Sequence, residues 1–351
     1  MSGRTMPVRK PIDWRTAAAK IAVLIPRERW EPRVLAWANA SSVRTPWAVG
    51  FSGGADSVAL LLLLWAHWPE RRRRLRALHF DHRLRGAESR ADANFCRRVC
   101  AALGIELVGG EWQGAHRGAS EAEARRARME FFARHARVVW LGHQQDDVAE
   151  TMLMRLARGS GAGGLSAPRP VQAQLRKRVH LRPLLAIKKS ELVAALRCAG
   201  IPWREDSSNA RGQFFRNRVR RDVLPAWNRA AERDAMGGAA RSRALLEEDD
   251  TALEAWLDTL KVTAPGRRLA LGPLAGKPRA LVRRALHRWL LTQSDAGELS
   301  RQGFDLLLEA VERGRATRQS LGRKGFAVIE KDVLRFQTVG KLRRKFQRTA
   351  N

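Results

Sequence analysis

A short apolar stretch, a glycine-containing loop and a long apolar stretch follow one another near the start of this chain, and this order strongly constrains its fold. Residues 47–51 have the composition of a buried strand, residues 58–66 suit a buried helix, and Ser52-Gly-Gly-Ala-Asp-Ser57 joins them. Glycines let the backbone approach an anion, and the N-terminus of the following helix presents unpaired N–H groups. The sequence therefore predicts a phosphate-binding turn at the end of a first strand.

The loop differs from two common nucleotide-binding motifs. It lacks the lysine with which a Walker A loop contacts the β- and γ-phosphates, and its glycines do not have the G-x-G-x-x-G spacing of a dinucleotide fingerprint. Asp56 is unexpected in an anion-binding loop unless a cation accompanies the anion. Two roles for Asp56 stay open, binding Mg²⁺ together with nucleotide phosphates or transferring a proton. An ordinary tight strand-to-helix turn is the non-functional alternative.

Residues 47–225 alternate apolar stretches with helical patterns, as parallel sheets built from βαβ units do. Each crossover is long enough to contain a helix, so right-handed connections give an open, doubly wound, Rossmann-like parallel sheet of the α/β class. Beyond the first strand, we predict strands at residues 75–80, 105–108 and 138–141, and helices at 58–65, 87–103 and 120–136.

The pattern becomes helical after about residue 230. Apolar residues recur at helical spacing over 281–290 and 304–311, and residues 326–329 and 333–336 have the pattern of a β-hairpin. We therefore expect a helical arm and a small α+β domain behind the catalytic domain. The expected divisions are an N-terminal helical extension (1–45), a nucleotide-binding catalytic domain (46–228), a helical arm (229–270) and a small α+β domain with a basic tail (271–351).

The charge of the chain favours a polyanionic partner. Lysines and arginines number 66 against 35 aspartates and glutamates, a formal net charge of +31, which points to nucleic acid first. The 44% of hydrophobic residues exclude a disordered basic protein. The chain has too few cysteines for a disulfide framework, no apolar run that could cross a membrane and no signal-peptide pattern. We expect a cytoplasmic protein without membrane contact.

A second group of polar residues follows the strand predicted at 138–141, within Leu141-Gly-His-Gln-Gln-Asp-Asp-Val-Ala-Glu-Thr151. On a helix, Asp147 and Glu150 are three residues apart and share one face. Two carboxylates at the carboxyl edge of the sheet in so basic a protein favour a bound cation, either a metal ion or an ammonium group. The alternative is a solvated first turn of a helix, where acidic residues are favourable in themselves.

These motifs and five further segments together resemble one family. The hexapeptide at 52–57 resembles the loop of the PP-loop ATP pyrophosphatases, which split ATP between its α- and β-phosphates to adenylate a substrate. With the segment at 141–151, the others narrow the resemblance to the bacterial tRNA(Ile)-lysidine synthetases, over about residues 46–225. They read His79-Phe-Asp-His-Arg-Leu-Arg85, Glu121-Ala-Glu-Ala-Arg-Arg-Ala-Arg128, Arg158-Gly-Ser-Gly-Ala-Gly-Gly-Leu165, Arg182-Pro-Leu-Leu185 and Trp203-Arg-Glu-Asp-Ser-Ser-Asn209 with Arg216-Asn217, Arg220 and Leu224-Pro225.

The resemblance implies a ligase that forms a carbon–nitrogen bond. ATP would adenylate the wobble cytidine of an isoleucine tRNA with a CAU anticodon at its carbon 2 oxygen. The ε-amine of L-lysine would then displace AMP, so that the products are lysidine, AMP and pyrophosphate. Lysine reacts only as the neutral amine, so a carboxylate must lie near it to take a proton. ATP and Mg²⁺ are the implied cofactors, and a homodimer is a possible assembly.

The resemblance also implies roles for individual residues. Asp56, Arg125 and Arg128 are the expected catalytic residues, the two arginines contacting phosphate or the transition state. Lysine binding falls to Asp147 and Glu150, and Asp56 is the candidate Mg²⁺ ligand. ATP binding is assigned to Ser52, Gly53, Gly54, Ala55, Asp56, Ser57 and His143. With the net charge, tRNA contacts are expected at Arg182, Arg216, Arg220, Lys341, Arg343 and Arg344.

Two other functions stay open. A tRNA thiolase of the same superfamily also adenylates a base, but it needs reactive cysteines or an iron–sulfur cluster. Cys96, Cys100 and Cys198 are more typical of buried structural cysteines. A non-catalytic basic RNA-binding protein has no need of an intact loop or of paired carboxylates. Departures from the family pattern at Met129 (usually Tyr), Asp81 (usually Asn) and residues 165–168 concern details of adenine or tRNA contact.

Overall fold

The computed structural model describes residues 12–83, 86–116, 118–174, 177–205, 215–293, 299–322 and 325–339. The chain divides into two compact units, Met1–Glu247 and Glu248–Asn351, each with a sheet of its own. The division falls within the long helix α11 (Ala235–Thr259). None of the described helices is long and apolar enough to span a membrane. The four-part division expected from the sequence stays a prediction.

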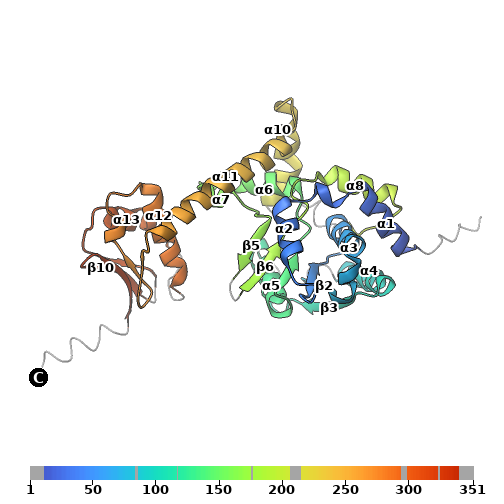
Figure 1. Cartoon of the computed structure of the whole chain (residues 1–351), viewed down its shortest axis with the longest axis horizontal. Coiled ribbons are helices and arrows are strands. Elements are labelled where there is room, and N and C mark those ends of the chain that lie inside the picture. The colour runs from blue at the N-terminus through green and yellow to red at the C-terminus, as the bar shows by residue number, and fades with distance from the viewer. Residues whose placement is uncertain are drawn as a thin grey trace, which may run out of the picture. The chain divides into compact units, whose positions relative to one another are not determined.

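A six-stranded sheet in the order β3-β2-β1-β4-β6-β5 forms the centre of the first unit (Figure 1). Strands β1 to β4 and β6 pair in parallel, and β5 is antiparallel to β6 at the edge. The predicted α/β class and the four predicted strands are confirmed. Half of the residues of β5 and β6 are polar, and neither strand was predicted. The strands are β1 (Trp47–Gly50), β2 (Leu75–Asp81), β3 (Glu106–Glu111), β4 (Val138–Trp140), β5 (Val171–Gln174) and β6 (Arg178–Leu181).

Alternate residues of the central strands pack into different cores on the two faces of the sheet. Trp47 and Trp140 belong to the larger core, which α1, α3, α4 and α8 complete. Ala48 and Val139 pack instead with two phenylalanines of α5 (Glu121–His135). Helices therefore cover both faces, which confirms the doubly wound arrangement. The helices of the larger core are α1 (Trp14–Leu24), α3 (Ala55–His67), α4 (Ala87–Leu103) and α8 (Lys189–Cys198).

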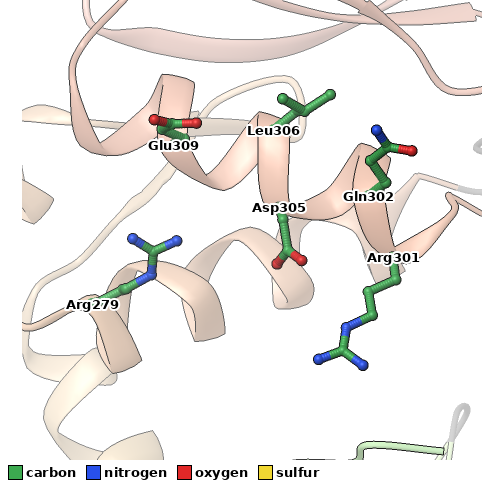
Figure 2. Close-up of a pocket in the computed structure, with 6 residues that line it drawn as sticks. All are labelled: Arg279, Arg301, Gln302, Asp305, Leu306 and Glu309. Atoms are coloured by element: carbon green, nitrogen blue, oxygen red, sulfur yellow. The ribbon is translucent and has the colours of Figure 1, made fainter.

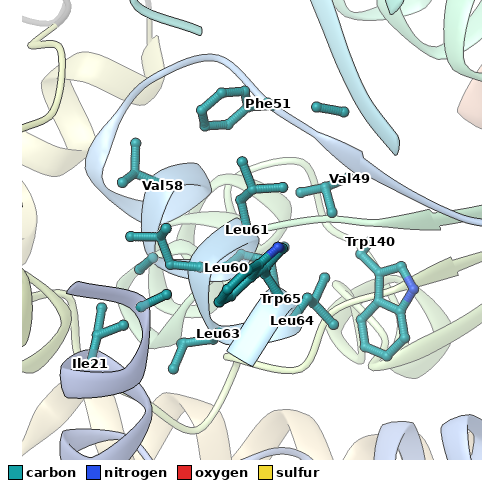
Figure 3. Packing of buried hydrophobic residues seen from close by; sticks show 14 of the residues in the cluster. Ile21, Val49, Phe51, Val58, Leu60, Leu61, Leu63, Leu64, Trp65 and Trp140 are labelled. Carbon is teal, nitrogen blue, oxygen red and sulfur yellow. The ribbon is translucent and has the colours of Figure 1, made fainter. Parts of the chain in front are cut away.

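Helix α3 lies at the centre of the larger core (Figure 3). Every residue from 58 to 64 is at most 1% exposed, and these side chains pack near Ile21 of α1 and Val49 of β1. Burial of each leucine contributes about 1.5–3 kcal/mol. This packing fixes the N-terminus of α3 and therefore the loop that precedes it.

The second unit packs helices against an antiparallel sheet in the order β7-β8-β11-β10-β9. The predicted hairpin and both predicted helices are present. An open hollow of about 510 Å³ on the two helices is lined by Arg279, Arg301, Gln302, Asp305, Leu306 and Glu309 (Figure 2). The elements are β7 (Thr263–Ala264), β8 (Arg268–Ala270), α12 (Arg279–Thr292), α13 (Arg301–Glu312), β9 (Thr317–Ser320), β10 (Gly325–Glu330) and β11 (Val333–Thr338).

Candidate active site

The loop at residues 52–57 turns from β1 into α3, as the sequence predicts. Ser52 Oγ lies 3.2 Å from Ser57 Oγ and accepts a hydrogen bond from the Gly54 N–H at 3.3 Å. The Gly53 backbone has a φ of +86°, in the left-handed region that favours glycine. No side chain within the described ranges caps the first N–H groups of α3. These donors and the helix dipole are therefore suited to an anion such as a phosphate.

Two other segments approach this loop through their backbones. The Arg204 N–H donates to the Gly53 carbonyl at 2.8 Å, and the Arg204 guanidinium pairs with Asp92 of α4 at 2.7 Å. Gly142, two residues after β4, lies so close that a Cβ there would be 2.8 Å from the carbonyl oxygen of Asp56. This close approach brings the segment after β4 beside the loop at residues 52–57, here called the phosphate loop.

For the ATP-dependent adenylation that the resemblance implies, we expect Gly142→Ala to lower the rate at least about tenfold. The added methyl group would meet the backbone of α3, so the loop must shift, and overpacking of this kind costs about 1–3 kcal/mol. Steady-state kinetics with ATP as the varied substrate measure the effect. Gly109→Ala on β3 is the matched control, because a Cβ there has no neighbour within 4 Å. Unchanged kinetics for Gly142→Ala would show that the loop does not depend on this contact.

Asp56 has the environment of a cation ligand. Its Oδ1 is buried and has no hydrogen-bond partner within the described part of the chain. Burial raises the pKa of Asp56 to about 6; the Lys189 ammonium acts against this rise and the Asp147 carboxylate adds to it. An unpartnered carboxylate oxygen beside a phosphate-binding loop fits one ligand of Mg²⁺, whose remaining ligands would come from nucleotide phosphates and water.

Replacing Asp56 by Asn is expected to stabilise the ligand-free protein above about pH 6 by roughly 1–3 kcal/mol. The folded-state pKa lies above the ordinary value of 3.8, so the buried carboxylate opposes folding only where it is ionised. The advantage of Asn should therefore fade as the pH drops from 6 toward 4. Denaturant unfolding of both proteins at pH 7.5 and pH 4.5 tests this, and an equal or larger advantage at pH 4.5 would contradict it.

Asp147 and Glu150 of α6 (Gln145–Leu156) share one face, as predicted, but they are not solvated. Glu150 is 0% exposed and Asp147 is 6% exposed, which excludes the alternative of a solvated helix turn. Arg216 donates from Nε to Glu150 at 2.8 Å and from Nη2 to Asp147 at 2.7 Å. Arg220 also binds both carboxylates, Asp147 at 3.3 Å. We call these four residues the ion-pair network.

The ion-pair network gives Arg216 and Arg220 partners that the sequence did not reveal. Arg216 belongs to α9 (Phe215–Arg218), and Arg220 lies in the π-helical turn η5 (Val219–Val223) that follows. Single π-helical turns are frequent at functional sites. The two guanidinium groups compensate the two carboxylates, so the network is neutral and joins α6 to the segment at 215–223. The tRNA contacts expected of these arginines stay predictions.

Three further arginines and a histidine have no such compensation. Arg125, Arg128, His143 and Arg182, here the cationic cluster, form no ion pair with any carboxylate of the described residues, and Arg128 Nε, His143 Nδ1 and Arg182 Nε are buried without partners. Burial lowers the pKa of Arg128 and of Arg182 to about 10, and nearby Arg125 adds to both effects. Burial and the surrounding arginines hold the pKa of His143 well below its ordinary value. This arrangement is suited to an anionic ligand.

Of the remaining residues expected to contact tRNA, one is buried and three lie outside the described residues. Arg182 is 3% exposed, which leaves little of its side chain available to a tRNA backbone. Lys341, Arg343 and Arg344 lie outside the described residues. Sequence reasoning missed Gly142, Lys189 and Arg204 as neighbours of the phosphate loop. Only Gly142 carried a usable signal, because this glycine directly follows the strand predicted at residues 138–141.

Cys96 and Cys100 are buried in positions unsuited to sulfur chemistry. Cys96 lies beneath the phosphate loop, where a Cβ on Gly53 would meet its Sγ at 3.3 Å. Burial raises the pKa of the Cys96 thiol far above its ordinary value and that of Cys100 to about 12, so neither is a thiolate at neutral pH. The expectation of buried cysteines is confirmed for these two and is wrong for Cys198, which is exposed.

Comparison with known proteins agrees with this geometry. A family model described as the PP-loop domain matches residues 28–227. A tRNA(Ile)-lysidine synthase of Hyphomonas neptunium is 36% identical over 317 residues, which make up 87% of this chain and 80% of the relative. The tRNA(Ile)-lysidine synthases of Solibacter usitatus and Geobacter sulfurreducens are 45% and 37% identical over 52% and 76% of this chain, and over 42% and 58% of their own length.

The doubly wound sheet, the glycine loop at the N-terminus of α3 and the matching family model define a PP-loop domain. Identity to the Hyphomonas relative extends over most of both chains. The chain belongs to the tRNA(Ile)-lysidine synthase family of PP-loop proteins. It spans about half the length of the Solibacter and Geobacter relatives.

Proposed function

We propose that the protein ligates L-lysine to carbon 2 of the wobble cytidine of an isoleucine tRNA with a CAU anticodon, and forms lysidine, AMP and pyrophosphate. The observation that carries this proposal is the buried pair Asp147 and Glu150 beside a phosphate loop that itself holds an unpartnered carboxylate. A protein that only binds nucleotide or RNA has no need of these carboxylates. Membership of the lysidine synthase family supports the same reading.

In the proposed first step, the phosphate loop and the cationic cluster bind the triphosphate of ATP. The N–H groups at the start of α3 and the hydroxyls of Ser52 and Ser57 donate to phosphate oxygens. Arg125 and Arg128 stabilise the negative charge that develops on the leaving pyrophosphate. Asp56 would hold Mg²⁺, which supplies positive charge between the phosphates. His143 is neutral and can donate one hydrogen bond to the nucleotide.

In the proposed second step, lysine binds to the ion-pair network through its charged groups. Its ammonium groups match Asp147 and Glu150, while its α-carboxylate matches the forked donors of Arg216 and Arg220. Lysine brings three charged groups to four partners, so the two arginines share its α-carboxylate and each buried group still faces an opposite charge. The carboxylates can then accept the proton that the ε-ammonium must lose before the amine attacks carbon 2 and displaces AMP.

The proposal includes a cytoplasmic protein that acts without membrane contact, and a homodimeric assembly. Light scattering of the purified full chain measures the assembly directly. A mass close to 39 kDa at working concentrations would refute the homodimer without bearing on the reaction.

Binding of tRNA should fall steeply with salt. A chain with a net charge of +31 that contacts roughly four to six phosphates should give a slope of about −4 in a plot of log affinity against log salt. Filter binding of unmodified CAU-anticodon tRNA between 50 and 300 mM salt, on the order of physiological values, measures this slope. A slope shallower than about −1 would contradict a backbone-directed tRNA surface.

Pyrophosphate exchange into ATP that depends on the tRNA tests the proposed first step. We expect exchange with CAU-anticodon tRNA and none without it, whereas a binding protein gives no exchange with any tRNA. Replacing Cys96, Cys100 and Cys198 together by Ser should leave full modification activity. Loss of tRNA modification in that variant, with adenylation retained, would favour the thiolase instead.

A further inference from the structure

Two adjacent glycines make the phosphate loop adaptable. Neither Gly53 nor Gly54 has a Cβ, so the loop alone leaves the peptide between them free to adopt several orientations. Gly53 has a φ of +86°, and the peptide that follows it is trans and planar. Its carbonyl oxygen and the Gly54 N–H therefore point in opposite directions, and a contact that holds one of these groups also orients the other.

The Arg204 N–H holds the Gly53 carbonyl through a hydrogen bond of 2.8 Å. On the other side of the peptide, the Gly54 N–H points toward Ser52 Oγ at 3.3 Å, which is long for a hydrogen bond. Ser52 Oγ in turn lies 3.2 Å from Ser57 Oγ, and the proposed function gives both hydroxyls to phosphate. In this orientation the Gly54 N–H adds a donor on the phosphate side, whereas a rotated peptide would present a carbonyl oxygen there.

The side chain of Arg204 fixes the segment that supplies this N–H. Its Nε donates to Oδ1 of Asp92, a buried residue of α4, at 2.7 Å. Arg204 Cγ would lie 3.4 Å from a Cβ on Gly53, and the Sγ of Cys96, one helical turn after Asp92, would lie 3.3 Å from it. The ion pair therefore joins residue 204 to α4 around Gly53.

We propose that Arg204 and Asp92 are positioning residues, which hold the Gly53–Gly54 peptide in the orientation that binds phosphate. The inference rests on the proposed function, which gives the loop to the triphosphate of ATP. Arg204 acts through its backbone N–H, and Asp92 acts through Arg204, so neither side chain has to touch the nucleotide. The pair has no net charge, so its contribution is the direction of a donor and not the attraction of an anion.

Replacement of Asp92 separates positioning from attraction by the sign of the effect. Through its charge alone, loss of a carboxylate beside the loop would strengthen the binding of a nucleotide. If the ion pair positions the peptide, Asp92→Asn and Arg204→Gln should each weaken nucleotide binding at least about tenfold. Calorimetric titration of α,β-methylene ATP with Mg²⁺ into the full chain, without tRNA or lysine, measures this affinity.

Arg76 of β2 and Glu106 of β3 provide the matched control, because they form an exposed pair from Nε to carboxylate at 2.8 Å. Glu106→Gln and Arg76→Gln should change the affinity less than about twofold. Arg204→Lys keeps the backbone N–H and a cation for Asp92, so its affinity should be within about threefold of that of the unaltered protein. The double variant Asp92→Asn with Arg204→Gln should bind at most about twofold more weakly than the weaker single variant, because both residues act through one contact.

Unchanged or stronger binding by Asp92→Asn overturns the positioning role, and so does a loss in Arg204→Lys as large as that in Arg204→Gln. If circular dichroism shows that Asp92→Asn does not fold, the two Arg204 variants decide the matter, since that side chain is 40% exposed. Binding is measured without turnover, so weaker binding by both single variants supports the positioning role even if no lysidine forms. Lysidine formation by the unaltered protein, with unchanged affinity in the variants, overturns the positioning role alone. An unaltered protein that does not bind the analogue overturns the phosphate role of the loop as well.

Discussion

Replacing Asp56 by Ala is expected to lower adenylation of the tRNA at least about a thousandfold, while tRNA affinity changes less than about twofold. The variant removes the carboxylate whose Oδ1 is buried and unpartnered beside the phosphate loop, and with it the proposed site for the cation on the phosphates. Single-turnover formation of adenylated tRNA, followed with labelled ATP, measures the first quantity. Filter binding measures the second.

Asp249→Ala is the matched control for this variant, since Asp249 is exposed on α11 and is distant in sequence from the loop. It should adenylate tRNA at the rate of the unaltered protein. A large loss of tRNA binding in Asp56→Ala would contradict the assignment of Asp56 to the nucleotide. Adenylation within about tenfold of the unaltered protein would remove Asp56 from the chemistry altogether.

Replacing Glu150 by Gln is expected to raise the KM for lysine at least about a hundredfold, with a change of less than about threefold in the KM for ATP. Glu150 is fully buried and receives hydrogen bonds from Arg216 and Arg220, so the neutral amide leaves one guanidinium charge uncompensated. Breaking a buried ion pair of this kind also costs about 3–5 kcal/mol of stability. Kinetics at a temperature where the variant is folded separate the rise in the KM for lysine from the loss of stability.

Glu130→Gln on α5 is the control for Glu150→Gln, because Glu130 is exposed and its carboxylate has no hydrogen bond or ion pair with another described residue. The double variant Glu150→Gln with Arg220→Gln removes one charge of each sign. It should recover part of the lost stability without recovering lysine affinity. Equal increases in the KM for lysine and for ATP in Glu150→Gln would refute a lysine site at the ion-pair network.

The unit of β1, the phosphate loop and α3 could be predicted from the sequence because the residues that determine it are neighbours in the chain. The apolar stretch at 47–51 and the one after Ser57 differ in length and surroundings, and the glycines between them mark the turn. The shared face of Asp147 and Glu150 followed from helical spacing alone. Strands β5 and β6 could not be predicted, because they form the edge of the sheet with residues that are half polar.

The partners of the carboxylates depend on tertiary structure. Arg216 and Arg220 reach Asp147 and Glu150 across 66 to 73 residues of sequence, a pairing that no local pattern encodes. The same holds for the burial of Arg182, which results from the pairing of β6 with β4 and from its bond to the Arg169 carbonyl. Residue types and spacing identified the charged groups of the site, whereas their division into a neutral network and an uncompensated cluster required the fold.

The most direct test of the central claim is mass spectrometry of unmodified isoleucine tRNA with a CAU anticodon after incubation with the protein, ATP, Mg²⁺ and isotopically labelled L-lysine. We expect the wobble cytidine to gain the mass of one lysine less one water, with the label retained and AMP formed in equal amount. An unmodified wobble cytidine under conditions where the protein binds both ATP and the tRNA would contradict the proposed function. Sulfur in place of lysine at the modified base would contradict it in favour of the thiolase.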